Sequence, residues 1–132
     1  MKKKNICFAI CTYTQAEELI IEANKKNIKP IIFIKYYLVR GFGIYWIKTL
    51  QKLLTKSFNK NAFKLYVDSS NDCGLSIDLI RLKINYIKLR SNQKLLYKIK
   101  QIAKKNNVLL NPSFRIIELS NIKNISRKIS TI

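Results

Sequence analysis

The residues of this chain that could take part in chemistry gather in two short polar segments. The first, Arg40 to Gly43, holds a cation and two glycines, and the second, Asp68 to Gly74, holds two carboxylates and a thiol. Backbone N–H groups of a glycine-rich turn ahead of a helix can bind a phosphate, and arginine adds positive charge. We therefore expect Arg40, Gly41 and Gly43 to bind an anion, although the complete nucleotide-binding motifs are absent.

Asp68 directly follows the apolar run 63–67 and is the candidate catalytic residue. A carboxylate at the end of a buried strand is costly unless it is paired or hydrogen-bonded. It could bind a ligand hydroxyl, hold a metal through water, or act as a base with a raised pKa. The alternative is a structural turn in which Asp68 accepts N–H groups from Ser70 or Asn71, a common role of aspartate.

Asp72 and Gly74 complete the predicted ligand-binding set. We expect Asp72 to cap the following helix rather than to act as a second catalytic carboxylate, and a magnesium site between Asp68 and Asp72 would be unspecific. Cys73 lies at the start of that helix, where the dipole can lower a thiol pKa. The preferred interpretation is a partly buried structural thiol, because unpaired cysteines are usually buried and inert.

The composition argues against histidine-based catalysis, a zinc site and a membrane span. The chain has no histidine, which removes the commonest general base and the commonest zinc ligand. Its three cysteines have no CxxC spacing and indicate reduced thiols of a cytoplasmic protein. Charges and glycines interrupt the most apolar segment, 31–46, so no membrane span is expected. The sequence predicts no metal site and identifies no cofactor.

Apolar runs alternate with helical patterns along the chain. The expected strands cover 5–11, 31–34 with a continuation toward Tyr36 and Tyr37, 63–67, 86–89 and 108–110. The region from 113 is an edge strand or a short helix. Such alternation predicts right-handed crossovers and a parallel sheet. We expect a single α/β domain over residues 1–120, with about five parallel strands and helices on both faces. A frayed tail should follow at 121–132. The alternative is half of a (β/α) barrel, which would pair with a second copy.

The carboxyl ends of parallel strands meet at one edge of the sheet, where ligands bind. The predicted set Arg40, Gly41, Gly43, Asp68, Asp72 and Gly74 follows these ends. We therefore expect a small anionic or phosphorylated ligand at this edge, and leave open whether the protein is an enzyme or a homodimer.

The formal net charge of +19 suggests a second function, the binding of nucleic acid or assembly through lysine-rich helices. However, the lysines are spread evenly, and the abundance of Lys, Asn and Ile matches A/T-rich codons. Nucleic acid is therefore not the favoured partner.

Two features resemble a family of small uncharacterised α/β proteins of proteobacteria. These are the turn Gly41-Phe42-Gly43-Ile44-Tyr45-Trp46 and a strand ending at Asp68, followed by Gly74-Leu75-Ser76-Ile77-Asp78-Leu79-Ile80-Arg81. The resemblance covers about residues 6 to 110 and implies an α/β fold without an established activity. This sequence departs from the family at Ser69, which stands where the family has a cysteine. The resemblance therefore does not imply a thiol chemistry for this chain. The junction between helix and strand also resembles units of (β/α) barrels.

Overall fold

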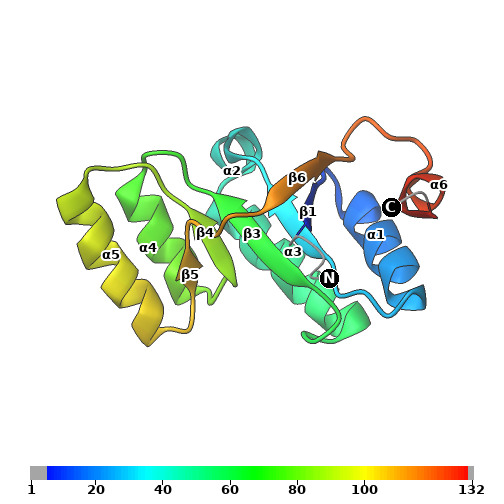
Figure 1. Cartoon of the computed structure of the whole chain (residues 1–132), viewed down its shortest axis with the longest axis horizontal. Coiled ribbons are helices and arrows are strands. Elements are labelled where there is room, and N and C mark those ends of the chain that lie inside the picture. Colours follow the sequence, from blue (N-terminus) through cyan, green and yellow to red (C-terminus); the bar gives the residue numbers. More distant parts are fainter. Residues whose placement is uncertain (1–5, 131–132) are drawn as a thin grey trace.

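The computed structural model describes residues 6–130, which form one parallel sheet and the helices that connect its strands (Figure 1). The elements follow one another in this order: β1 (Ile6–Ala9), α1 (Tyr13–Lys25), β2 (Ile31–Ile34), α2 (Tyr36–Phe42), α3 (Ile44–Phe58), β3 (Lys64–Asp68), α4 (Cys73–Arg81), β4 (Tyr86–Lys88), α5 (Gln93–Lys105), β5 (Leu109–Leu110), β6 (Arg115–Glu118) and α6 (Ile125–Ser130).

The sheet has six parallel strands in the order β5-β4-β3-β2-β1-β6, which confirms the predicted α/β class. The strand beyond the expected number is β6, one of the two alternatives for the region from 113. It pairs with β1, with Cys7 in register with Ile116 and Ala9 with Glu118. The carboxyl ends of the strands point to the top of Figure 1, where α2 lies.

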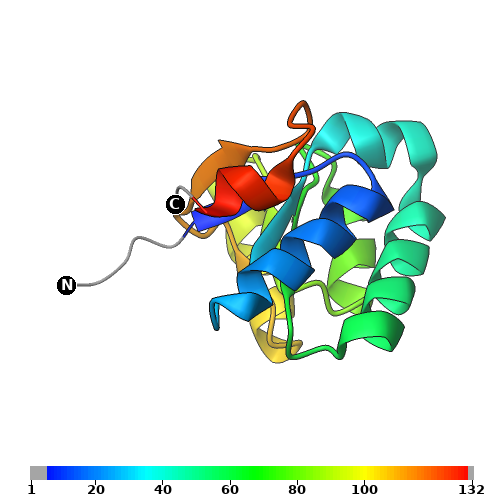
Figure 2. The ribbon, with the colours of Figure 1, turned by 90° about the vertical axis from the view of Figure 1, so that its right-hand side faces the viewer.

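All six helices of residues 6–130 send their buried side chains to one face of the sheet, so the expectation of helices on both faces is wrong. The main core contains side chains from every helix, among them Leu19 of α1, Leu50 of α3 and Ile99 of α5. The physical reason is the strand order: β1 to β5 lie in chain order, and right-handed crossovers that always step in one direction place every helix on the same face. Figure 2 shows α1 and α3 to the right of β1 and β6. This is the arrangement of consecutive barrel units.

The opposite face carries a small aromatic cluster. Phe33, Tyr66 and Tyr86 of β2, β3 and β4 gather there, and Phe114 packs edge-on against both tyrosines, with ring centroids 5.7 Å from Tyr66 and 4.9 Å from Tyr86. Phe114 belongs to the segment that joins β5 to β6, which crosses in front of β4 and β3 in Figure 1. The cluster therefore takes the place of a helix layer on this face.

The same segment shows that the sheet is curved. Because β5 and β6 lie at opposite edges, a flat sheet would separate them by roughly 24 Å, at about 4.8 Å per strand spacing. The chain from Leu110 to Arg115 spans at most about 18 Å. The sheet must therefore curl toward the aromatic cluster, which makes this face concave.

Residues 121–130 correct the prediction of a frayed tail. They include α6, whose Ile125 and Ile129 are buried in the main core, and α6 packs beside α1 (Figure 2). Apolar residues one turn apart on a short helix explain the docking. Residues 131 and 132 of the predicted tail lie outside the described part of the chain.

Hydrogen bonds of Gln15 fix the start of α1. A capping box begins α1, in which Thr12 accepts from the backbone N–H of Gln15 and the Gln15 side chain accepts from Thr12. Gln15 also donates to the carbonyl of Ser120 at 2.8 Å, which ties α1 to the segment after β6.

No helix within residues 6–130 is long and apolar enough to cross a membrane.

Candidate functional site

A hollow of about 520 Å³ lies at the carboxyl edge, between the α2–α3 junction and the start of α4. It brings together Arg40, Gly43, Asp72 and Gly74, which are four of the predicted site residues. Arg40 and Gly43 follow the carboxyl end of β2, and Asp72 and Gly74 follow that of β3, far from the first pair in sequence. The structure thus assembles most of the predicted set in one place, whereas Gly41 and Asp68 do not line the hollow.

The α2–α3 junction turns at Gly43. Its φ of +87° lies in the left-handed region that favours glycine, and its N–H donates to the carbonyl of Val39 at 2.7 Å. Gly41 lies in the last turn of α2, with open space around the position of a Cβ. The expectation that the N–H groups of Gly41 and Gly43 bind an anion is therefore wrong. Gly41 continues α2, and the N–H of Gly43 is used in the hydrogen bond that ends this helix.

Asp72 is the N-cap of α4, as predicted. Its Oδ1 accepts the N–H of Leu75 at 2.9 Å, while the N–H of Ser76 bonds the Asp72 carbonyl. The N–H groups of Cys73 and Gly74 in the first turn have no intrahelical acceptor. Gly74 lines the hollow, so one of these two donors lies at its wall.

The hollow contains one cation and two carboxylates. Arg40 makes no ion pair with any residue in the described range 6–130. Asp78 lies 3.7 Å from Arg81, and Asp72 is engaged by the backbone of α4. Among the described residues, Arg40 is therefore the charged group of the hollow that has neither an ion pair nor a hydrogen bond.

Asp68 takes the structural role that the sequence left as its alternative. Its Oδ1 accepts the N–H of Ser70 at 2.8 Å, and Ser70 has a left-handed φ of +54°. Arg90 closes the same turn, donating its backbone N–H to the Ser70 carbonyl at 2.7 Å and its guanidinium to the Ser70 hydroxyl at 3.1 Å. The buried Ser69 hydroxyl donates to the Lys88 carbonyl at 2.7 Å. The turn is thus held on both sides.

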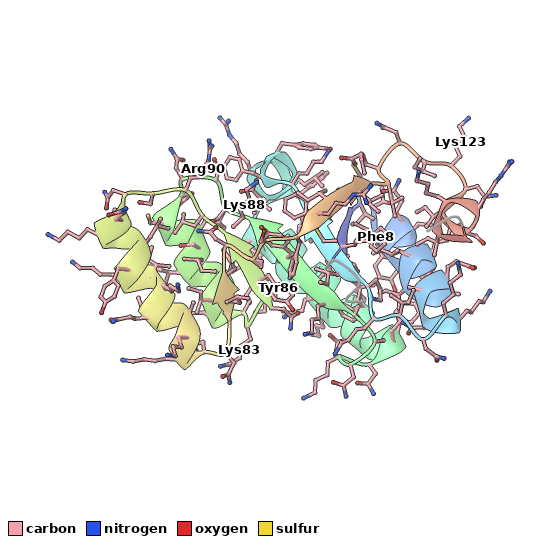
Figure 3. All side chains as sticks on the ribbon, in the orientation of Figure 1. Phe8, Lys83, Tyr86, Lys88, Arg90 and Lys123 are labelled. Carbon is pink, nitrogen blue, oxygen red and sulfur yellow. The ribbon has the colours of Figure 1, made fainter. Side chains whose placement is uncertain are left out.

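A second group of charged residues lies on the concave face. Tyr66 and Tyr86 belong to the aromatic cluster, and residues two positions apart on a strand share a face. Asp68 and Lys88 therefore lie on this face, and they are Cα partners of neighbouring strands. Figure 3 labels Tyr86 and Lys88 on β4 and Arg90 beyond its end.

Lys35 and Glu118 extend this group across β1. Lys35 lies two residues beyond Phe33 of the aromatic cluster, and Glu118 is in register with Ala9 on the same face. The two side chains form an ion pair. We call Glu118, Lys35, Asp68 and Lys88 the charged row. Its charges alternate in sign from β6 to β4, and Lys35 and Glu118 are ion-paired, which fits a structural role better than a ligand site.

Sequence reasoning missed three members of the charged row, namely Lys35, Lys88 and Glu118. Each of these residues ends or directly follows a strand, and this position was the sign in the sequence that could have added them to the candidate set. Which of these side chains meet depends on the strand order and register, and neither can be derived from local pattern.

The titrating groups of the concave face reflect burial and their neighbours. Burial alone would raise the pKa of Glu118, but hydrogen bonds from Lys35 and Ser120 outweigh it and lower that pKa. Burial raises the pKa of Cys7 to about 11 and that of Tyr66 to about 12. A hydrogen bond with the Cys11 thiol, at 3.3 Å, raises the pKa of Tyr37.

The three cysteines are free thiols. Cys7 is fully buried, whereas Cys11 and Cys73 are half-buried. Cys73 Sγ lies 3.8 Å from the Ser91 hydroxyl, its only hydrogen-bond partner among the described residues. This position agrees with the structural interpretation of Cys73.

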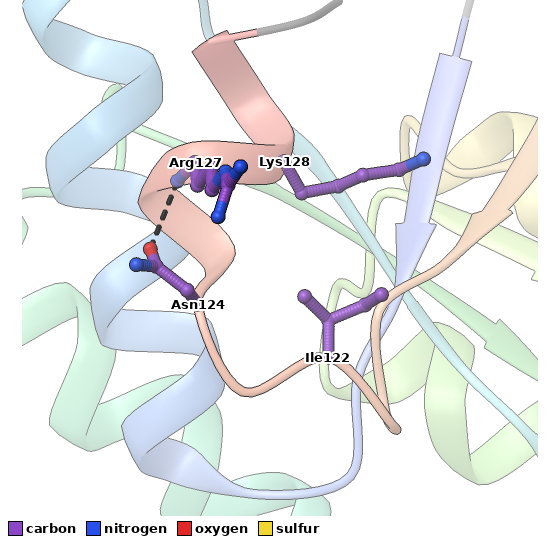
Figure 4. Close-up of a pocket in the computed structure, with 4 residues that line it drawn as sticks. All are labelled: Ile122, Asn124, Arg127 and Lys128. Carbon is purple, nitrogen blue, oxygen red and sulfur yellow. Dashed lines mark hydrogen bonds between the residues drawn. The ribbon is translucent and has the colours of Figure 1, made fainter.

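Another hollow, of about 390 Å³, lies beside α6 (Figure 4). It is lined by Ile122, Asn124, Arg127 and Lys128, and the Asn124 side chain accepts the N–H of Arg127 at 2.9 Å. This bond caps α6. None of the predicted site residues lies there, so this hollow is separate from the site at the carboxyl edge.

Comparison with known proteins gives a likeness of fold. No family model matches the chain, and no curated protein matches it. Among solved structures, the chain is similar to one described as a "putative fructose-1,6-biphosphate aldolase" from Coccidioides immitis, with a TM-score of 0.58 and 15% identity. The match covers 80% of this chain and 45% of that one, so this chain spans less than half of the longer protein. At this identity the likeness concerns the fold alone.

Proposed function

We propose that this chain binds a small anionic or phosphorylated ligand at the carboxyl edge of its sheet. The observation that supports the proposal best is the hollow in which Arg40 faces the first turn of α4. The ligand site would be this hollow rather than the charged row, because Lys35 is already paired with Glu118 and Lys88 lies next to Asp68 on the neighbouring strand.

Two kinds of donor would hold the anion. A guanidinium can make paired, charge-assisted hydrogen bonds to a phosphate or carboxylate, and Arg40 has no competing ion pair within residues 6–130. The N–H groups of Cys73 and Gly74 at the positive end of the α4 dipole favour negative charge. Gly74 adds no side chain, so a ligand can approach the backbone closely.

The remaining predicted residues would act indirectly. Gly43 sets the angle between α2 and α3 and so positions Arg40 opposite α4. Asp72 stabilises the helix whose first turn offers the donors. Asp68 would order the turn before α4, and Gly41 has no direct part. The three free thiols agree with a cytoplasmic protein, in which cysteines stay reduced.

The test is isothermal calorimetry with inorganic phosphate, followed by a thermal-shift screen of phosphorylated metabolites. Arg40→Ala should abolish the heat of binding and the melting shift. Arg115→Ala removes the same charge from an exposed position on β6 and should leave both unchanged. Equal losses in the two variants, or full binding by Arg40→Ala, would refute the proposal.

Gly74→Ala provides a second test at the opposite wall of the hollow. A Cβ at this position would lie 3.5 Å from Asp72 Oδ1, an ordinary contact, so the variant should fold. The added methyl group should weaken binding by obstructing the first turn of α4. Unchanged affinity would show that the ligand does not approach this turn.

A further inference from the structure

The outer surface of α5 is strongly positive. The helix carries five exposed lysines and no acidic residue: Lys94, Lys98, Lys100, Lys104 and Lys105. None of these five forms an ion pair with a residue in the described part of the chain. Three of the seven acidic residues of the protein lie on α1, at the opposite end of the helix layer (Figure 1). Among the helices of residues 6–130, α5 therefore carries the most cations.

A hollow of about 300 Å³ runs beside this helix, toward the end of β5. Tyr97 and Lys100 form one wall, and Leu96 and Leu110 supply apolar surface. The Tyr97 side chain is 65% exposed, so its ring is available to a partner. Gln93 also lines the hollow, and its side-chain amide makes no hydrogen bond with any described residue.

The tyrosine and the lysines share one side of the helix. Gln93, Tyr97, Lys100 and Lys104 follow one another at intervals of four, three and four residues, which places them in line along a helix. An aromatic ring set in a line of cations is the combination with which proteins bind single strands: bases stack on the ring while cations follow the phosphates.

An anionic membrane surface fits α5 less well. A helix that lies on a membrane buries an apolar face among the acyl chains. The apolar stripe of α5, formed by Leu96, Ile99 and Ala103, is already directed into the protein core, where α5 contacts α4 and β5. The surface left to a partner consists of the line of lysines with Tyr97 and of Leu95 and Ile102, each of which is only 40% exposed.

We propose that α5 and the adjoining hollow bind single-stranded nucleic acid. A base stacks on Tyr97 in the hollow, the Gln93 amide hydrogen-bonds its edge, and Lys100 and Lys104 contact the flanking phosphates. This surface is separate from the hollow that contains Arg40, so Arg40→Ala leaves binding of the strand unchanged.

The test measures the affinity of the full chain for a fluorescent single-stranded oligonucleotide by anisotropy, at a series of salt concentrations. In a single strand each phosphate contact contributes about −0.7 to the slope of log K against log salt. Lys100→Gln with Lys104→Gln should therefore reduce the slope by about 1.4. The matched control is Lys48→Gln with Lys52→Gln, two exposed lysines of α3, which also has no acidic residue. This control should leave the slope unchanged.

Stacking is tested separately. Tyr97→Ala should weaken binding roughly 5- to 140-fold, the equivalent of about 1–3 kcal/mol per stacked base. Tyr97→Phe keeps the ring and should retain the affinity. Tyr45→Ala, which removes a 78% exposed ring from α3, should have no effect. All of these positions are exposed, and melting temperatures equal to that of the wild type will establish that the variants are folded.

Three outcomes would overturn the proposal. Equal slope changes in the α5 and α3 lysine pairs would mean that the charge binds polyanions diffusely. Full affinity in Tyr97→Ala would exclude stacking. Tighter binding to vesicles of anionic lipid than to the oligonucleotide, lost in the α5 pair, would identify a membrane surface as the partner.

Discussion

Lys35, at the end of β2, forms an ion pair with Glu118, the last residue of β6, although β1 lies between these strands. The pair reaches across β1 on the face where Ala9 places only a methyl group. It links the edge strand to the centre of the sheet, next to the bond from Gln15 to Ser120. The carboxyl end of β6 is thus held from both faces.

The pH dependence of this pair follows from the lowered pKa of Glu118. A carboxyl group whose folded pKa lies below its ordinary value of 4.5 stabilises the protein above that value, and the contribution is lost as the pH falls through the folded pKa. Both side chains are partly exposed, so Glu118→Gln should cost at most about 1 kcal/mol at pH 7 and less at pH 2. Urea unfolding at the two pH values measures this difference. A loss that is equal at both would mean that the charge plays no part.

Phe114→Ala tests whether the aromatic cluster holds the curved sheet together. Phe114 is half-buried and contacts Tyr66 and Tyr86, so the substitution should cost about 2 kcal/mol, below the ~3–5 kcal/mol of a fully buried phenylalanine. Phe42→Ala is the control, since Phe42 is 62% exposed and has Trp46 as its ring partner. Denaturant melts that show the same loss in both variants would argue against a special role of Phe114.

The cysteines should differ in reactivity toward Ellman's reagent at pH 8. Cys7 is buried, with a pKa raised to about 11, so almost no thiolate forms there. Two thiols should react in the native protein, and the third only after denaturant is added. In Cys7→Ser the native count should remain two, and denaturant should add none. Three fast thiols in the wild type would contradict the burial of β1.

Docking of α6 predicts a cost for shortening Ile125. The side chain is fully buried, so Ile125→Ala should destabilise the protein by about 2 kcal/mol or more. Lys123→Ala, on the exposed loop before α6 (Figure 3), should change stability by less than about 0.5 kcal/mol. If thermal unfolding shows both variants equal to the wild type, residues 121–130 do not contribute to the folded core.

Much of the lining of the hollow at the carboxyl edge could be predicted because it depends on local order. Arg40, Gly43, Asp72 and Gly74 each follow the carboxyl end of a strand, and all parallel strands present these ends at one edge. The role of Gly41 could not be predicted, since whether a glycine turns the chain or continues a helix depends on the packing of its neighbours. The ion pair of Lys35 with Glu118 required knowledge that β6 lies beside β1.

The sequence by itself determined the α/β class, because continuous apolar runs alternate with amphipathic segments, and this periodicity depends on each residue's immediate neighbours. The apolar run 31–34 forms β2 as predicted, but its expected continuation toward Tyr36 and Tyr37 is wrong, because α2 begins at Tyr36. Only the tertiary structure decided the strand order, the single helix layer, the docking of α6 and the strand β6, whose residues are mostly exposed. These features arise from contacts between distant segments, whose free energy depends on geometry that no local pattern encodes.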